Sequence, residues 1–240
     1  MRTEPEKRFI YRILQQGSIR LKPDGTRMLS LEHRCTAVLI WPEGEPPSEK
    51  NTVLTDPCFT RRGFQDALKQ LGEIEFSFDR IGRIFVTHPH SDHCLHLPSA
   101  TSRQDFPYFQ PGNDDDVMSG IFAFSCPGHS PKLKALVFRT AWEGNVWITG
   151  DAVLDEEWLR AWEFFWPNIY STADIIKTWK SLGTIIRNAD IIVPGHGSPI
   201  RVTAPLLEDL ISNFSGAAHS EHCKDIEHAL RERLEQLQAA

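Results

Sequence analysis

Short hydrophobic runs, separated by turn-forming residues, recur along the chain. They are rich in β-branched and aromatic residues, which is typical of β-strands. By contrast, residues 97–120 carry prolines and an acidic triplet, so we expect an irregular segment with at most one short strand. The strands are expected over 8–14, 35–41, 51–56, 83–87, 121–125, 135–139, 146–149 and 190–193.

Helical periodicity appears between and after these strands. Apolar residues at every third or fourth position predict a helix over 60–71, with Gly72 where a helix commonly ends. Ser171 resembles the start of a capping box that opens a second helix. Further helices are expected over 204–214 and 220–238, the latter with one apolar stripe among many charges. The order strands, helix, strand occurs twice and indicates two similarly built halves.

Composition places the chain among ordinary globular proteins. Its 240 residues are 40% hydrophobic and 24% charged, which suits one buried core. No apolar run reaches the roughly 18 residues of a membrane span. The N-terminal stretch has no secretory pattern and the five cysteines have no paired spacing, so we expect a cytoplasmic protein. The formal net charge of −6 argues against a nucleic-acid partner.

Histidines and aspartates stand directly after several of the expected strands. RIFVT is followed by HPHSDH, IFAFS by CPGH, VWIT by GD and DIIV by PGHG. The side chains of alternate residues in an extended loop point the same way, so His88 and His90 can bind one ion. The side chains of Asp92 and His93 then point in other directions and can bind a second ion. Imidazole and carboxylate suit zinc, and also iron or manganese. The predicted ligands of a site for two divalent ions are His88, His90, Asp92, His93, His129, Asp151 and His196.

The ordered strings HxHxDH, PGH, GD and PGHG resemble the metal-binding motifs of the metallo-β-lactamase superfamily. The resemblance spans residues 56–197 and implies an α/β (α+β) fold, a four-layer αββα sandwich with metals at the sheet edges. Residues 1–203 would form this domain, with residues 204–240 as C-terminal helices packing on it. Because residue 151 is Asp and not Cys, the chain looks similar to short glyoxalase II-like members, and to lactonases and nucleases, more than to the zinc β-lactamases.

The resemblance also implies roles for individual residues. Asp56, in TDPCF, would support the site from behind without binding metal. One ion would be held by His88, His90 and His129, the other by Asp92, His93 and His196, and both by Asp151.

These ligands predict a hydrolytic mechanism. A water bridging two divalent ions is expected to titrate near neutrality, so hydroxide is the nucleophile and one ion polarises the electrophile. Asp151 or Asp92 would orient this hydroxide and carry a proton. We therefore expect a dinuclear metal-dependent hydrolase that cleaves a small-molecule ester, thioester or lactone. The alternatives are a phosphodiesterase or nuclease of the same fold, an iron-dependent sulfur dioxygenase, and a non-catalytic binding protein.

An aromatic segment over residues 152–170 follows the GD string. Its Trp158, Trp162 and either Phe165 or Trp166 recur at helical spacing. Such a stripe forms either an apolar wall of the substrate pocket or a packing face on the core or on another subunit. An oligomer is therefore compatible with the sequence.

Other polar residues near these motifs are weaker candidates. Tyr170 is one candidate for a contact with a substrate oxygen, and Lys132 one for a contact with an anionic substrate group, although lysines that flank a loop are usually solvated. Arg61 and Arg62, at the start of a predicted helix, are expected to be surface charges. The histidines expected at the surface or in packing are His33, His96, His219, His222 and His228.

Overall fold

The computed structural model describes residues 7–94, 108–109, 116–163 and 170–239. These residues form two β-sheets. The first sheet contains, in spatial order, β1 (Phe9–Gln15), β2 (Ala37–Pro42), β3 (Val53–Thr55), β4 (Arg83–Phe85) and β5 (Tyr108–Phe109). The second contains β11 (Ile200–Arg201), β10 (Ile191–Pro194), β9 (Gly144–Gly150), β8 (Lys134–Thr140), β7 (Ile121–Ser125) and β6 (Asp116–Met118).

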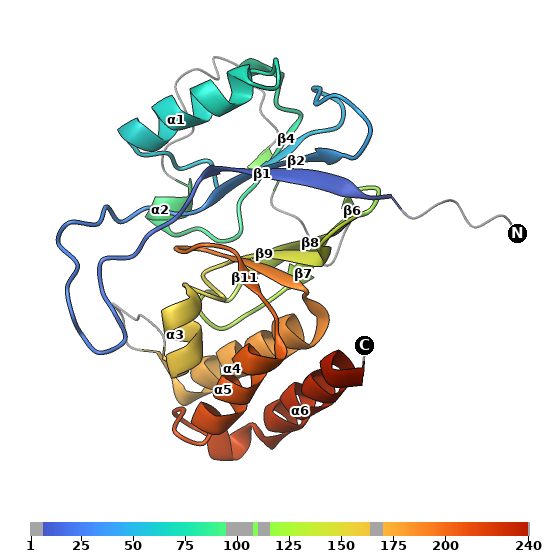
Figure 1. Cartoon of the computed structure of the whole chain (residues 1–240). Helices are drawn as coiled ribbons and strands as arrows, with labels where there is room; N and C mark the ends of the chain where they lie inside the picture. The colour runs from blue at the N-terminus through green and yellow to red at the C-terminus, as the bar shows by residue number, and fades with distance from the viewer. Residues whose placement is uncertain (1–6, 95–107, 110–115, 164–169, 240) are drawn as a thin grey trace, which may run out of the picture.

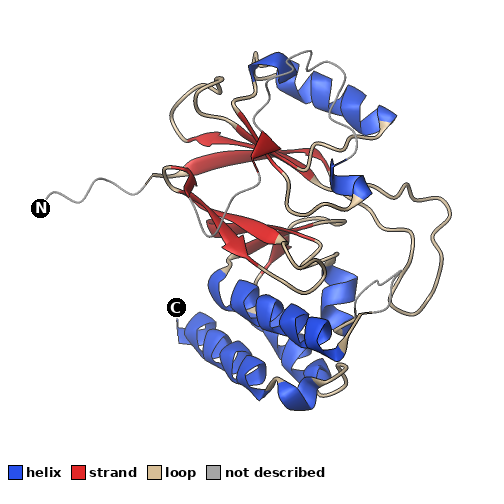
Figure 2. Cartoon of the chain, turned by 180° about the vertical axis from the view of Figure 1, so that it is seen from behind, coloured by secondary structure: helices blue, strands red, loops and turns tan. Residues whose placement is uncertain are grey.

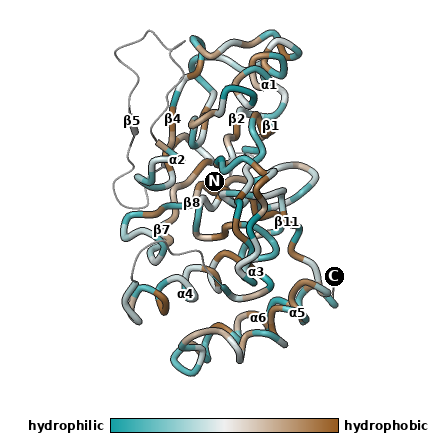
Figure 3. The backbone as a smooth tube through the Cα atoms, turned by 90° about the vertical axis from the view of Figure 1, so that its left-hand side faces the viewer, coloured by the Kyte–Doolittle hydropathy of each residue, from teal (hydrophilic) through white to brown (hydrophobic). Residues whose placement is uncertain are grey.

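Helices cover the outer faces of both sheets. They are α1 (Arg61–Gly72), the short α2 (Ser91–Cys94), α3 (Glu156–Ala161), α4 (Thr172–Asn188), α5 (Ala204–Phe214) and α6 (Lys224–Ala239). Helix α1 lies on the first sheet, while α3, α4 and α5 lie on the side of the second, and α6 packs on α4 and α5 (Figure 1). The view from behind and the side view show the same four layers (Figure 2, Figure 3). The predicted αββα sandwich is therefore confirmed.

Alternating burial along the strands explains this layering. On β8, Leu136 and Phe138 face the first sheet, whereas Ala135 packs toward the helices. On β2, Val38 lies between the sheets and Leu39 packs toward α1. Each sheet therefore has two apolar faces, and each face is covered by a neighbouring layer. No helix among the described residues is long and apolar enough to cross a bilayer.

Strand direction brings several strand ends to one edge of the sandwich. Strands β3 and β4 are parallel, as are β9 and β10. Strands β7 and β9 each pair antiparallel with β8, so they share a direction. Lys134 N, at the start of β8, donates to Thr87 O just beyond β4 at 3.0 Å. This bond ties the end of the first sheet to the same edge of the second.

Most predicted elements are present, with differences at their ends. Gly72 lies inside α1, whose C-cap is Glu73. The helix predicted over 220–238 is interrupted at Cys223, so a 3₁₀ turn precedes α6. Within 97–120, β5 and β6 form where one strand at most was expected, while residues 97–107 and 110–115 lie outside the described residues.

Candidate metal centre

Five loops meet at one edge of the sandwich, each directly after a strand. The HPHSDH loop follows β4 and runs into α2. The loops after β7, β9 and β10 carry His129, Asp151 and His196, and Asp56 follows β3. Because parallel strands end at the same edge, residues more than a hundred positions apart in sequence become neighbours.

The ligand atoms of these loops form two groups that share one carboxylate. One group is His88, His90, His129 and Asp151, and the other is Asp92, His93, His196 and Asp151. Within each group the candidate atoms lie within 4.8 Å of one another. His90 and Asp92 are partly exposed while the other ligands are buried. The open side of the centre therefore lies at His90 and Asp92.

Three buried atoms of the centre make no hydrogen bond within the structure: His88 Nε2, His93 Nε2 and Asp151 Oδ1. His93 Nε2 lies 3.1 Å from Asp151 Oδ1, and His88 Nε2 lies 3.6 Å from Asp151 Oδ2. These contacts are close enough for ion pairs but are not aligned for hydrogen bonds. An unpartnered buried polar atom costs about 1–3 kcal/mol, and a cation between such atoms removes that cost. The residues therefore fit divalent metal ions that accept nitrogen and carboxylate ligands.

Asp56 fixes one histidine ring in each group. It is 1% exposed, and its Oδ2 lies 3.0 Å from His93 Nδ1. The same oxygen accepts from Thr87 Oγ1 at 2.8 Å, and Thr87 Oγ1 lies 3.1 Å from His88 Nδ1. Since the Thr87 hydroxyl gives its proton to Asp56, its oxygen accepts from the His88 ring. Asp56 thus holds His93 directly and His88 through Thr87, and both Nε2 atoms face the centre.

The loop of His196 is held against the first sheet. Gly195 O accepts from Thr36 N at 2.7 Å, and His196 Nδ1 lies 2.9 Å from Arg34 O. A Cβ atom at Gly195 would lie 2.1 Å from Asp151 Oδ1. Only glycine lets this loop approach the shared carboxylate so closely.

His33 is the residue of this site that the sequence did not reveal. Its Nε2 lies 3.0 Å from Asp92 Oδ2. Its ring stacks on that of His196, with centroids 4.7 Å apart. His33 is partly exposed, as expected, but it lies beside two ligands. No local signal could show this, because His33 and Asp92 are 59 positions apart.

The histidines of the two groups differ in proton affinity. Burial lowers the pKa of His129 to about 3 and also lowers the pKa of His90. Burial likewise opposes protonation of His93 and His196, but the Asp151 carboxylate outweighs it. The pKa of His93 therefore lies well above its ordinary value, and that of His196 is also raised.

The carboxylates are held in their charged form. Burial alone would raise the pKa of Asp151, but the charges of His196 and His93 hold it well below its ordinary value. Burial would also raise the pKa of Asp92, but the hydrogen bond from His33 and the charge of His93 lower it. Both aspartates are therefore ionised at neutral pH and available as ligands.

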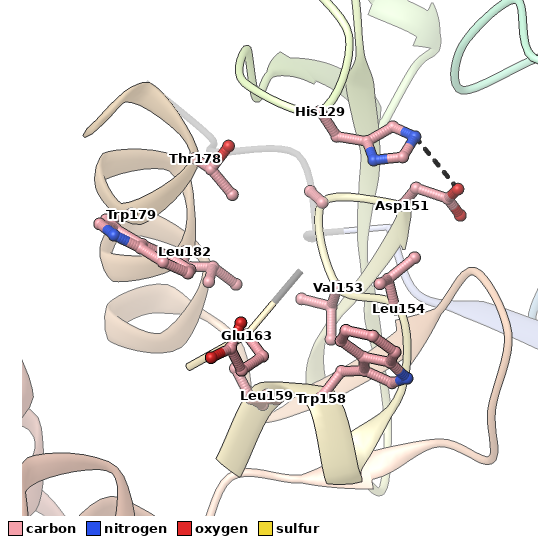
Figure 4. A pocket seen from close by; sticks show the side chains of 11 residues that line it. His129, Asp151, Val153, Leu154, Trp158, Leu159, Glu163, Thr178, Trp179 and Leu182 are labelled. Atoms are coloured by element: carbon pink, nitrogen blue, oxygen red, sulfur yellow. Dashed lines mark ion pairs between the residues drawn. The ribbon is translucent and has the colours of Figure 1, made fainter. Parts of the chain in front are cut away.

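Trp158 lies beside a small cavity behind the metal centre. Together with His129 and Asp151 it lines a cavity of about 20 Å³ (Figure 4). Such a space has room for about one water molecule. Trp158 Nε1 donates to Leu21 O at 3.1 Å. The assignment of Trp158 to the substrate pocket therefore stays a prediction.

Trp162 belongs to the core of the helical layer. It is 1% exposed, its Nε1 donates to Leu210 O at 2.8 Å, and its ring packs 4.6 Å from that of Phe214. These contacts agree with the packing-face alternative for Trp162, and its assignment to the substrate pocket stays a prediction. Phe165 and Trp166 lie outside the described residues.

Tyr170 and Lys132 do not join the ligand groups. The Tyr170 hydroxyl donates to His129 O at 2.7 Å, so it anchors that loop. Lys132 is exposed, and no described contact links it to the centre. His96 lies outside the described residues. The histidines found near the C-terminal end are His219, His222 and His228, around the turn before α6 and on α6 itself.

No protein-family model matches the chain, and no curated protein matches it in sequence. Among solved structures, the chain is similar to a Thermotoga maritima protein described as a metallo-β-lactamase, with a TM-score of 0.53 and 18% identity over 81% of this chain and 99% of that one. It is also similar to an N-acyl homoserine lactone hydrolase with N-hexanoyl-L-homoserine at its catalytic metal centre (TM-score 0.51, 17% identity, 80% of this chain and 93% of that one). A B. thuringiensis protein with N-decanoyl-L-homoserine bound at its active site gives the same TM-score of 0.51 at 17% identity, over 80% and 93% of the two chains.

These identities are low, so the likeness establishes the fold and not the activity. The layer order and the strand-end positions of the histidines and aspartates agree with it. The resemblance indicated by the HxHxDH string is thus confirmed at the level of architecture: the chain has the metallo-β-lactamase fold.

Proposed function

We propose that this chain is a dinuclear metal-dependent hydrolase of a small-molecule ester, thioester or lactone. The observation that carries the proposal is the pair of ligand groups sharing Asp151, with unpartnered buried atoms facing the space between them. Two complete ligand groups about one shared carboxylate are the arrangement expected of a two-metal hydrolytic site.

Divalent ions bound there, zinc first and iron or manganese as alternatives, would supply a Lewis acid for the substrate carbonyl and lower the pKa of a water molecule. The residues of the chain provide the rest. Asp151 and Asp92 have depressed pKa values, so at neutral pH they are ionised and can accept a hydrogen bond or a proton from that water molecule. Asp56 and Thr87 fix the histidine rings that face the centre. A substrate approaches from the side of Asp92, which is partly exposed.

Support for a carbonyl substrate comes from two fold neighbours whose structures hold N-acyl homoserines at their catalytic centres. An aspartate at position 151 also resembles the lactonase and glyoxalase II side of the superfamily. The net charge of −6 weighs against the nuclease alternative. The complete second group, Asp92, His93 and His196, weighs against a sulfur dioxygenase with one iron.

The direct test is hydrolysis by the metal-loaded protein of a panel of thioesters, lactones, aryl esters and phosphodiesters. Asp151→Ala is expected to lower kcat/KM at least about 100-fold, because both ligand groups lose their shared oxygen atoms. Asp66→Ala is the matched control, since Asp66 is exposed and pairs with Arg62 at 3.9 Å on α1. Turnover of none of the carbonyl substrates, or of phosphodiesters alone, would overturn the proposal.

A further inference from the structure

A groove of about 450 Å³ opens beside the second ligand group. One wall is formed by residues 32–34, from the loop between β1 and β2, and the other by residues 58–61, which lead into α1. Ser91 and Asp92 line it as well. Its volume lies within the range of roughly 300–1,000 Å³ that is typical of small-molecule sites.

The groove is continuous with the metal centre. Asp92, a member of the second ligand group, lines it, and so does His33, which contacts Asp92. The space on the other side of the centre, behind His129 and Asp151, is only about 20 Å³. Of these two spaces, only the groove has room for the part of a substrate that extends away from the scissile bond.

One positive charge in the groove has no partner among the residues that the structure describes. Arg34 Nη1 lies 3.6 Å from Glu32 Oε2, so these two lining charges offset each other. The charge of Asp92 faces the second ligand group and would be offset by an ion bound there. The side chain of Arg61 makes no hydrogen bond or ion pair with another described residue. The groove therefore presents a free guanidinium group, which suits a carboxylate.

Beside Arg61 the groove wall is aromatic. Phe59 is partly buried, and its ring makes edge contacts with Phe78 at 5.4 Å and Phe64 at 6.2 Å between centroids. These contacts hold the Phe59 ring in place, so it offers a preformed apolar surface. An apolar surface next to a cation fits a short aliphatic chain that ends in an anionic group.

We propose that this groove binds the acyl chain of the substrate and that Arg61 selects substrates whose acyl chain ends in a carboxylate. This rests on the proposed hydrolase function and names the class of substrate for the same centre. Phe59 contacts the aliphatic part of the chain, and the scissile carbonyl lies at the ligand groups near Asp92.

The test compares two esters of one phenol: the monoester of adipic acid and the ester of hexanoic acid, which have equally long acyl chains and differ by a terminal carboxylate. For the wild-type protein, kcat/KM is expected to be about five- to tenfold higher for the adipate ester, mainly through KM, and this preference shrinks as ionic strength rises. Arg61→Ala abolishes the preference, Arg61→Glu reverses it, and Arg61→Lys retains most of it. The control is Arg62→Ala, since Arg62 neighbours Arg61 in sequence but pairs with Asp66.

The outcomes separate this proposal from the proposed function. Cleavage of both esters with no preference, or a preference that Arg61→Ala leaves intact, overturns the role of the groove and leaves the hydrolase standing. Cleavage of neither ester counts against the hydrolase, and the groove is then tested by calorimetric binding of the corresponding monoamide of adipic acid. Equal binding of this amide to the wild type and to Arg61→Glu would overturn the groove proposal as well.

Discussion

At the scale of single residues, Asp92 is held from two sides. Its inner side faces His93 and His196, with Asp92 Oδ2 3.8 Å and 3.4 Å from their Nε2 atoms. On its outer side, His33 lies 3.0 Å away and is partly exposed. A partner that orients a ligand raises the affinity of a metal site without binding the metal.

We expect His33→Ala to weaken ion binding in the second group about 10- to 100-fold, because Asp92 loses its outer hydrogen bond. His33→Gln should retain most of the affinity, since a side-chain amide can donate from nearly the position of Nε2. Competition with a chromogenic chelator measures both binding steps. His228→Ala is the control, because His228 is largely exposed on α6. Equal weakening of both steps, or no change in either, would contradict this role.

Protons should compete with metal ions more strongly in the second group than in the first. The raised pKa values of His93 and His196 keep these rings protonated to higher pH, so an ion there must displace protons. His129, with a pKa of about 3, is already neutral in weak acid. We expect zinc titrations to give one ion per chain near about pH 6 and two near about pH 8. Loss of both ions over the same pH range would show that the two groups do not differ in this way.

The sequence reveals the candidate metal ligands far better than the residues that hold those ligands in position. His88, His90, Asp92 and His93 are visible because they share one short loop after a strand. His33 is not visible, because only the folded β1–β2 loop brings it to Asp92. A sequence motif predicts the geometry of one loop, whereas the contacts between the ligands and the residues around them depend on how the two sheets pack.

At the scale of elements, the sequence predictions fail where an element is too short to show a periodic pattern. They also fail where the chain leaves a helix before the helical spacing of residues ends. Strand β11 has two residues and α3 has six, so neither gives a periodic signal. Trp158 and Trp162 have helical spacing, but Trp162 is the C-cap of α3 with φ 50°. The chain turns out of the helix there, so the two rings do not share a face. Spacing alone could not separate a ring beside the centre from one in the core.

We expect Trp162→Ala to lower the free energy of unfolding by about 3–5 kcal/mol, because it removes a buried ring and leaves a cavity. Urea denaturation measures this loss. Trp142→Ala is the matched control, since Trp142 is 90% exposed, and its stability should be unchanged. If Trp162→Ala kept its stability and raised KM instead, Trp162 would belong to a substrate pocket after all.

At the scale of the whole molecule, α5 and α6 lie in the helical layer with α3 and α4. Leu207, Leu210 and Phe214 of α5 and Leu230 of α6 are buried in the same cluster as residues of β8, β9 and α4. The free energy of this burial contributes to the stability of the sheet that carries Asp151 and His196.

A chain shortened to residues 1–203 should therefore lose cooperative unfolding, because the apolar cluster that α5 and α6 share with α4 and the second sheet would be partly exposed. Thermal unfolding followed by circular dichroism tests this, and the full-length chain should show one transition. A shortened chain with a sharp transition and nearly full stability would show that these helices are an appendage.

The central claim is that two ligand groups about Asp151 each hold a metal ion. Elemental analysis after zinc loading and dialysis at pH 8 tests it most directly, in the wild type and in His129→Ala and His196→Ala, one from each group. We predict two zinc ions per wild-type chain and one in each variant. A wild-type chain that retains one ion or none, or a variant that loses both ions or neither, would contradict the account.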